Sequence, residues 1–330
     1  MALVQIAAET APARPSDVPD RLRGVLDAMP AGAPLAVLIH GFKFRPGDPA
    51  RDPHVQLFGA DPRARRCADW PAGLGFSAED PADGLCLGFG WDAAAPRRPS
   101  RRGFARAYAR APEAGARLAD LLAALHARRP DLRADLFAQS LGARVALAAL
   151  HAPGVRRALL LGAAEDAGAA RATLDAGPPG PEVIHVAARH NDLFDLMFEA
   201  AAPRGPDGRR ARALGREGLP GRPDWIDLQL DAPALAAWLE GRGLALAPTS
   251  PAVCHWSFYA RPGAMALYRA MLRDPAALWS PAGLRAACIP EGLAPRWSRL
   301  APRPPRWAGR LGGGWRGAPA PQGGAGMQAA

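Results

Sequence analysis

The chain has 330 residues, of which 49% are hydrophobic and 22% charged, an ordinary globular composition that excludes overall disorder. The formal net charge is +10, yet Lys43 is the only lysine among 41 basic residues, and the abundance of Arg, Ala, Gly and Pro is typical of GC-rich coding. We therefore expect no nucleic-acid partner from the charge alone, and the stretch from Glu291 onward carries six of the arginines with one acid.

The first part of the chain predicts one helix, one buried strand and a long irregular segment. Helical spacing of apolar residues predicts a helix over 20–29, ended by Pro30. The continuous apolar run LAVLIH at 35–40 predicts a strand that is buried on both faces. Residues 43–83 are rich in Pro, Asp, Arg and Gly, and an irregular stretch of this length is typical of a functional loop or lid.

From residue 85 onward, buried strands alternate with helices. Strands are predicted at 85–91, 134–139, 157–163, 183–188 and 225–230, with a short strand or turn at 253–259. Helices are predicted at 108–129, 141–151, 193–200, 233–240 and 263–272. This alternation implies an α/β fold with a mostly parallel central sheet and helices on both faces. We expect an N-terminal segment over 1–30, the α/β domain over 31–289, and a Pro/Gly/Arg-rich tail without a fixed fold over 290–330.

The cysteines and the hydropathy of the chain favour a soluble protein of a reducing compartment. The four cysteines, Cys67, Cys86, Cys254 and Cys288, form neither a C-x-x-C pair nor a zinc-ligand pattern with histidine. No apolar run reaches the roughly 18 residues of a membrane-spanning helix, and the N-terminal stretch lacks the charged start of a secretory signal. We expect a cytoplasmic protein without a transmembrane segment.

The segment ADLFAQSLG at 134–142 has the pattern of a nucleophile elbow. A strand ends, Ser140 follows, and a helix begins at once, with the small residues Ala138 and Gly142 on either side. A turn this tight needs small residues there, because a larger side chain would meet the neighbouring backbone. The serine hydroxyl would then stand above the sheet at the start of a helix. Serine is also a preferred helix N-cap, so the segment alone leaves both interpretations open.

A second motif, His40-Gly41-Phe42, follows the first predicted strand. Acyl transfer needs two backbone N–H groups that are directed at the carbonyl oxygen. The N–H of Leu141 can supply one and the N–H of Phe42 the other, because Gly41 allows the backbone to come close. The two motifs together therefore favour an oxyanion hole beside Ser140.

A serine nucleophile also needs a base and a group that orients the base. Asp192 follows the fifth predicted strand, where functional groups of open α/β sheets collect, and His255 is the last histidine of the chain. Ser140, Asp192 and His255 thus occur in the order nucleophile, acid, histidine that this architecture uses. Asp195 is a rival acid and Asp166 a weaker one, and all three acids also fit a role at a helix N-terminus.

These motifs together resemble the α/β-hydrolase superfamily, over residues 30–275. The likeness is closer to a bacterial branch of unknown function related to lipase-like esterases, in which a strand ending in Trp, like GFGWD at 88–92, precedes a long helix and the elbow. Ala138 stands where many relatives have Gly, and Gln139 where a His is common. The segment 43–83 and the tail have no counterpart in the family.

The resemblance implies a serine hydrolase that cleaves a carboxylic ester or a related acyl bond of a small molecule through an acyl-enzyme intermediate. In that mechanism Ser140 attacks, His255 takes its proton and Asp192 orients the imidazole. The N–H groups of Phe42 and Leu141 hold the oxyanion. No metal or organic cofactor is implied.

Three aromatic residues at or near strand ends are candidates for an apolar acyl pocket, namely Phe42, Trp91 and Trp256, and each also fits simple core packing. The alternative to an enzyme is a non-catalytic binding or scaffold protein that keeps the fold and uses its basic tail. Dependence of activity on the triad distinguishes the two.

Overall fold

The computed structural model describes residues 3–59, 69–76, 83–95, 100–205, 208–248, 253–274, 278–287, 289, 291 and 293. They all belong to one compact unit, Met1–Arg296. The predicted tail at 290–330 lies outside the described residues except for residues 291 and 293, and Cys67 and Cys288 lie outside them as well. Of the two described cysteines, Cys86 is buried and Cys254 is half-buried, and both are free thiols.

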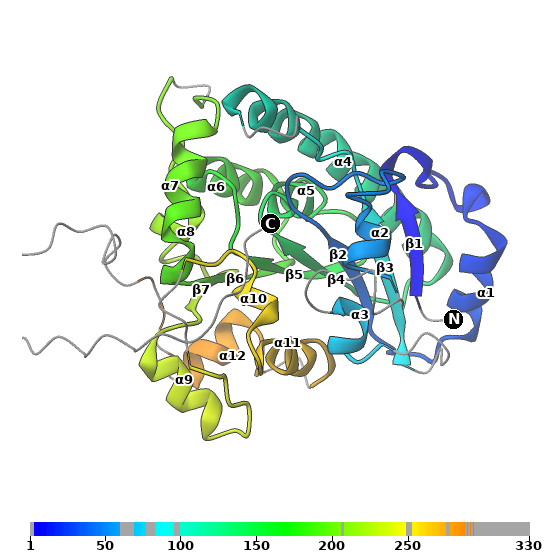
Figure 1. Ribbon diagram of the computed structural model, residues 1–330. Coiled ribbons are helices and arrows are strands. Elements are labelled where there is room, and N and C mark those ends of the chain that lie inside the picture. Colours follow the sequence, from blue (N-terminus) through cyan, green and yellow to red (C-terminus); the bar gives the residue numbers. More distant parts are fainter. Residues whose placement is uncertain are drawn as a thin grey trace, which may run out of the picture. The chain divides into compact units, whose positions relative to one another are not determined.

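Seven strands form one sheet in which all hydrogen-bonded neighbours are parallel (Figure 1). The strands are β1 (Leu3–Ala7), β2 (Leu35–Ile39), β3 (Leu85–Gly90), β4 (Ala134–Gln139), β5 (Val155–Leu161), β6 (Glu182–Ala187) and β7 (Trp225–Gln229). Their order across the sheet is β1-β3-β2-β4-β5-β6-β7, which makes β4 the middle strand.

Strand β2 illustrates why the central strands are apolar throughout. Leu35, Val37 and Ile39 belong to the hydrophobic core on one face of the sheet. Ala36 and Leu38 belong to a second core on the other face, because successive side chains of a strand point to opposite sides. All five residues are therefore buried, and the sequence shows a continuous apolar run rather than alternation.

Helices cover both faces of the sheet (Figure 1). The first face carries α1 (Asp20–Ala28), α4 (Arg101–Arg128), α5 (Gly142–Ala148), α6 (Ala167–Ala176), α7 (Asp192–Ala201) and α8 (Leu214–Glu217). The second face carries α3 (Trp70–Gly73), α9 (Pro233–Glu240), α10 (Ser257–Ala260), α11 (Ala264–Arg273) and α12 (Pro281–Ala286). The short α2 (Pro53–Gln56) leads into Leu57 and Phe58 of the second core.

The connections that leave β2 and β4 cover opposite faces of the sheet. The chain from β2 to β3 passes through α2 and α3 on the second face, whereas β4 continues into α5 on the first. The two strands pair directly, with Ile39 beside Ala138 near their carboxyl ends. In open α/β sheets, ligands bind at such a topological switch point, beyond the carboxyl ends of the strands. His40 and Ser140 are the residues that follow the two strands there.

The α/β class and the parallel sheet that the sequence predicts are confirmed, with several differences in detail. β1 was not predicted, because it is a short edge strand that pairs only with β3, and Gln5 interrupts its apolar run. Since β1 joins the sheet and α1 packs on the core, residues 3–28 are part of the same compact unit as the sheet.

Helical differences have local causes. The long helix α4 begins at Arg101 rather than at residue 108, because the Ser100 hydroxyl caps it by accepting a hydrogen bond from the Gly103 N–H. The Ala-rich helix α6 was missed, although the Asp166 carboxylate caps it through the Ala169 N–H. Within 253–259, expected as a strand or turn, the chain makes a bend and then enters α10.

Candidate active site

Ser140 stands in a strained turn between β4 and α5. Its φ of +57° is left-handed, a conformation that Lys43 alone shares among the described non-glycine residues. Three backbone hydrogen bonds of 2.9 to 3.0 Å hold the turn, since the Ser140 N–H donates to the Leu161 carbonyl and the Ser140 carbonyl accepts from Ala143 and Ala164. A strained residue that is fixed by its surroundings in this way is typical of a functional site. The turn has the sharp strand-to-helix backbone that a nucleophile elbow requires.

The turns after β2 and β4 touch each other, and glycines make this approach possible. A Cβ added to Gly142 would lie 2.6 Å from the carbonyl oxygens of His40 and Ile39. A Cβ added to Gly41 would lie 2.8 Å from the Cβ of Ser140. Both distances are shorter than any real contact of a Cβ allows, so larger residues would force the turns apart. The His-Gly motif therefore lies directly beside the serine.

The backbone N–H groups of Phe42 and Leu141 donate hydrogen bonds to no other residue in the described part of the chain. The next N–H along the first turn, that of Lys43, donates to the Ala93 carbonyl at 2.9 Å, so the turn is otherwise anchored. Backbone N–H groups are normally paired in a folded protein. Two unpaired N–H groups, one from each of the touching turns, are the donors that an oxyanion hole needs.

The side chain of His40 holds the turn after β2 in shape. Its Nε2 accepts a hydrogen bond from the Trp91 N–H at 3.0 Å, so Nδ1 carries the proton and donates to the Gly41 carbonyl at 2.9 Å. The Trp91 indole N–H in turn donates to the His40 carbonyl at 3.0 Å, and the two rings are stacked. Burial lowers the pKa of His40 to about 3, so this ring is neutral at pH 7 and serves the turn rather than the chemistry.

The three aromatic residues predicted for an acyl pocket differ in how far they are exposed. Trp91 is buried in the first core beneath His40, where it shapes the turn and lines no open surface. Phe42 is half-buried and meets the ring of Phe104 edge-on, with 5.3 Å between ring centroids. Trp256 is largely exposed next to His255. Phe42 and Trp256 thus keep positions from which they can meet an apolar ligand, and Trp91 does not.

His255 is held between the ends of β4 and β6. The preceding residue, Cys254, donates its N–H to the carbonyl of His190 at 3.1 Å, and the side-chain amide of Gln139 lies 3.5 Å from the His255 carbonyl. The imidazole stacks on the ring of Phe194 in α7, with centroids 4.5 Å apart. Since Gln139 directly precedes Ser140, the histidine lies at the same end of the sheet as the serine.

A chain of three side chains orients the imidazole of His255. Its Nδ1 lies 2.6 Å from the Oδ1 of Asn191, which belongs to a 3-10 helix of one turn, η4 (Arg189–Asn191), after β6. The Nδ2 of Asn191 donates to Oδ1 of Asp195 at 3.0 Å, and Asn191 and Asp195 are 2% and 4% exposed. Because Asp195 can only accept, the amide of Asn191 must present its oxygen to His255, and the proton of the imidazole lies on Nδ1.

The pKa of His255 leaves its ring neutral at pH 7. Burial, and to a smaller extent the neighbouring His190, lowers the pKa of His255 to about 4. With the proton on Nδ1, the unprotonated Nε2 is the nitrogen that can accept a proton. Among the described residues, however, Ser140 and His255 share no hydrogen bond, and such contacts in ligand-free sites are often long and shorten when substrate binds.

The acids predicted from the sequence have different partners. Asp192, the predicted triad acid, is the first residue of α7 and is buried, but the group that accepts the hydrogen bond from His255 Nδ1 is the side-chain oxygen of its neighbour Asn191. Asp195, the rival, reaches the histidine through Asn191. Asp166 caps α6 and also accepts a hydrogen bond from the Arg212 N–H at 2.7 Å. It therefore has the role at a helix N-terminus that the sequence left open for it.

Asn191 was missed as a site residue, although one signal pointed to it. It is the only asparagine in 330 residues, as Lys43 is the only lysine, and both lie at the turns beside the serine and histidine. Because the composition disfavours both residue types, a single copy of either stands out, and this is the sequence signal that indicates Asn191. The sequence favoured the neighbouring Asp192 instead, because a carboxylate is the usual partner of a catalytic histidine.

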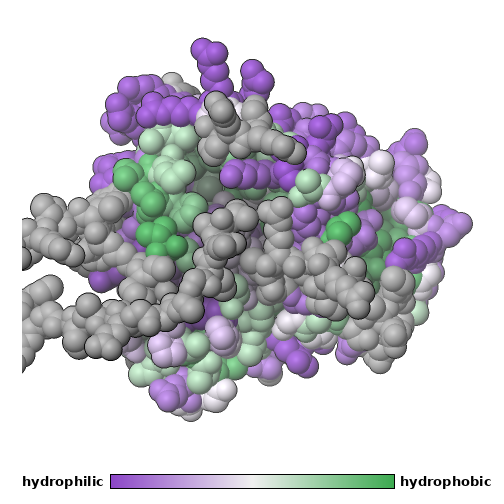
Figure 2. All heavy atoms as spheres, in the orientation of Figure 1, coloured by the Kyte–Doolittle hydropathy of each residue, from purple (hydrophilic) through white to green (hydrophobic). Residues whose placement is uncertain are grey.

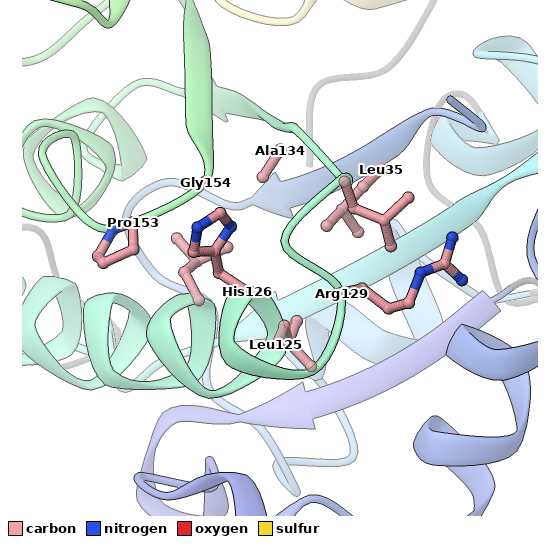
Figure 3. Close-up of a pocket in the computed structure, with 9 residues that line it drawn as sticks. Leu35, Leu125, His126, Arg129, Ala134, Pro153 and Gly154 are labelled. Atoms are coloured by element: carbon pink, nitrogen blue, oxygen red, sulfur yellow. The ribbon is translucent and has the colours of Figure 1, made fainter. Parts of the chain in front are cut away.

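Two hollows in the described structure lie at the opposite end of the sheet from this site. Figure 3 shows a cavity at the opposite, amino ends of β2 and β4, beside His126 and Arg129. Its volume of about 10 Å³ is too small for more than a single water molecule. A larger hollow of about 380 Å³, lined in part by Arg133 and Arg156, also lies at the amino ends. Within the described ranges, no three His, Cys, Asp or Glu side chains are grouped closely enough to hold a metal ion.

No protein-family model matches the chain, and a search of curated proteins also finds no match, so the functional proposal rests on the geometry of the site.

Proposed function

We propose that the protein is a serine hydrolase of the α/β-hydrolase fold that cleaves a carboxylic ester or related acyl bond. The observation that carries the proposal is the strained Ser140 turn, which lies against the turn after β2. Each of the two turns holds a backbone N–H group, that of Leu141 and that of Phe42, which has no hydrogen-bond partner among the described residues. A structural serine at a helix start needs neither the left-handed backbone nor the second turn.

The arrangement of the sheet supports the proposed fold. The sheet is parallel throughout, and the serine turn follows its middle strand, β4. The serine also lies at the switch point between connections that cover opposite faces, where α/β enzymes place their sites. The histidine comes from a later segment of the chain, in the order that the resemblance implies.

The proposed reaction proceeds in two steps. In the first, Oγ of Ser140 attacks the acyl carbon while Nε2 of His255 takes the hydroxyl proton, and the N–H groups of Phe42 and Leu141 stabilise the oxyanion. His255 then donates the proton to the leaving alcohol oxygen as the C–O bond breaks, which leaves the acyl group on Ser140. In the second step a water molecule gives its proton to Nε2 and attacks the acyl carbon, and Oγ leaves and regains the proton.

For the residue that orients His255, we propose Asn191 in place of Asp192. The distance of 2.6 Å between Nδ1 and the Asn191 oxygen supports this assignment, and the hydrogen bond to Asp195 prevents the amide from turning over. Asn191 is uncharged, so it fixes the tautomer of the base without raising its pKa as a carboxylate would. This fits the low pKa of His255, which keeps the base unprotonated across the neutral range.

The decisive experiment is labelling of the purified full-length chain with a fluorophosphonate probe, which reacts only with an activated serine. Wild type is compared with Ser140→Ala, with His255→Ala, and with the matched control Ser16→Ala, whose exposed hydroxyl donates to Asp17. We expect labelling of wild type and of the control, and none of Ser140→Ala or His255→Ala.

A folded wild type that does not react would refute the hydrolase and favour the non-catalytic alternative. Labelling that persists in Ser140→Ala would show that another serine reacts and would also contradict the proposal. Thermal denaturation of each variant verifies that the substitution has left the fold intact.

A further inference from the structure

Helix α7 packs Phe198 into the core, but it also buries two acidic side chains and exposes three large apolar ones, which is unusual for a surface helix. Asp192 and Asp195 are both buried. Leu193, Leu196 and Met197, in contrast, are among the few large apolar side chains with substantial exposure. The buried Asp195 accepts a hydrogen bond from Asn191, so that side of α7 faces the candidate active site. Leu193, Leu196 and Met197 lie on the side of the helix that faces solvent.

A second segment extends this apolar surface beside His255. Val253 and Trp256 flank the histidine and are also exposed, and their segment is joined to η4 by the hydrogen bond from Cys254 to His190. We call the following set the apolar rim: Leu193, Leu196, Met197, Val253 and Trp256, which are 36% to 52% exposed. Figure 2 shows apolar atoms gathered over α7. In the described part of the chain only Val55 is a comparably exposed large apolar residue away from the rim.

Positive charge lies next to the apolar rim. The segment 204–216, which follows the carboxyl end of α7, carries five arginines and one acid, Asp207, and Arg204 and Arg210 are exposed. The nearby acids are paired, since Glu199 accepts from Arg216 and Glu217 from Arg212, each at 2.9 Å. The exposed positions of α7 itself carry no acid. The surface therefore combines exposed apolar side chains, one of them a tryptophan, with a neighbouring segment of net positive charge.

We propose that the apolar rim and the adjacent arginines form a docking surface for an anionic lipid membrane. Leucine, methionine and tryptophan side chains that stand out from the surface can enter the boundary between headgroups and acyl chains, where tryptophan is especially stable. Arginines beside them attract acidic headgroups. Such binding is peripheral, and none of the described helices has the length and apolar character to cross a bilayer. The proposal does not depend on the hydrolase activity.

Vesicle sedimentation with the full-length chain tests the docking surface. The probes are vesicles of phosphatidylcholine alone and vesicles with one part in three phosphatidylglycerol, at several salt concentrations. We expect binding to the anionic vesicles that weakens with salt. Met197→Gln and Leu196→Gln should each lower the partition constant about fivefold. About half of each side chain is exposed and available to enter the membrane, so each substitution loses about half the free energy of burying a whole apolar side chain.

Val55→Gln is the matched control, since Val55 is 45% exposed but lies outside the apolar rim. It should bind within twofold of wild type, which separates the apolar rim from the net charge and tail that all variants share. Arg210→Gln should weaken binding to the anionic vesicles alone. Circular dichroism and thermal denaturation show that the variants are folded.

Three results would overturn the proposal. The first is failure of the folded wild type to bind anionic vesicles. The second is binding that Met197→Gln and Leu196→Gln leave unchanged, which would assign it to charge elsewhere in the chain. The third is a dimer in sedimentation velocity that Met197→Gln dissociates, which would make a second copy the occupant of this surface.

Discussion

The substitution Asn191→Ala tests the proposed orientation of the base more directly than any other single change. It removes the acceptor 2.6 Å from Nδ1 of His255 and the donor 3.0 Å from Asp195, but leaves the neighbouring Asp192 in place. Alanine fits a buried 3-10 turn without strain, so the substitution acts through the lost side chain. The two lost hydrogen bonds have separate consequences, one for turnover and one for stability.

The effect on turnover follows from the tautomer of His255. Without the Asn191 oxygen, the imidazole proton on Nδ1 loses its acceptor, and a ring protonated at Nε2 cannot accept the serine proton. A wrong tautomer in a serine protease triad lowers turnover by about 10⁴, so we expect kcat/KM to fall by about 10²–10⁴. The carboxylate of Asp195 loses a hydrogen bond of a kind that contributes about 1.5–3 kcal/mol to stability. A loss of that size lowers Tm by about 5 °C in a domain of this size.

The assay is hydrolysis of a 4-nitrophenyl ester chosen from a panel of acyl lengths, with Tm measured on the same samples. Asp192→Asn is the matched control, because it changes the adjacent acid at constant shape and should keep kcat/KM within about threefold of wild type. Asn191→Asp gives a second comparison. It keeps an acceptor for His255 but replaces the amide that donates to Asp195 by a carboxyl group, so the two acids must share a proton and we expect Tm to fall.

An exchange of effects between the two variants would refute the assignment of Asn191. Should Asp192→Asn lose a hundredfold while a folded Asn191→Ala retains its activity, Asp192 is the orienting acid, as the sequence alone predicts. Loss in both variants with no change in Tm would mean that neither residue acts alone and that the contact from Asn191 is one of two.

Other predictions concern the turns and the two neutral histidines. Gly41→Ala would place a Cβ 2.8 Å from the Cβ of Ser140, so we expect fluorophosphonate labelling to slow at least tenfold and stability to fall by about 1–3 kcal/mol in urea denaturation. Because the pKa of His255 is lowered to about 4, kcat/KM should be flat above about pH 5 and fall below pH 4, and a limb near pH 6.5 would contradict the assignment. The pKa of His40 is about 3 in the folded chain and about 6.5 in the unfolded one, so the unfolded state binds more protons and stability falls as the pH drops below 6.5. This histidine should make the free energy of unfolding about 2 kcal/mol smaller at pH 5 than at pH 7, and His40→Asn should abolish that share of the pH dependence.

Features carried by contiguous residues were predictable from the sequence. The apolar runs of the central strands mark them as buried on both faces, and β4 was predicted with the bounds that the structure has. The Ser140 turn was predictable for the same reason, because the strand, the serine and the helix follow one another directly. Local sequence determines these elements, and the sheet then aligns the residues that follow its strands.

Features that depend on long-range side-chain contacts were not predictable. Asn191 meets His255 across 64 residues, and no periodicity indicates which of the residues at the start of α7 faces that loop. Trp91 has the same difficulty. Its position at the end of β3 fits an open pocket, and only the hydrogen bonds to His40, 51 residues earlier, turn its ring into the core. The contact partner rather than the local pattern decides the role of each residue.

The order of strands in the sheet also determines how long one edge of β2 stays unpaired while the chain is being synthesised. β2 is complete at Ile39, but the strand that covers one of its edges, β4, is complete only at Gln139. At synthesis rates of about 5–20 residues per second, this edge stays open for about 5–20 s. All five residues of β2 are apolar, and an open edge of that kind readily pairs with other chains. The pairing of β4 with β2, which brings Ser140 against Gly41, is thus also the step that ends this interval of exposure to aggregation.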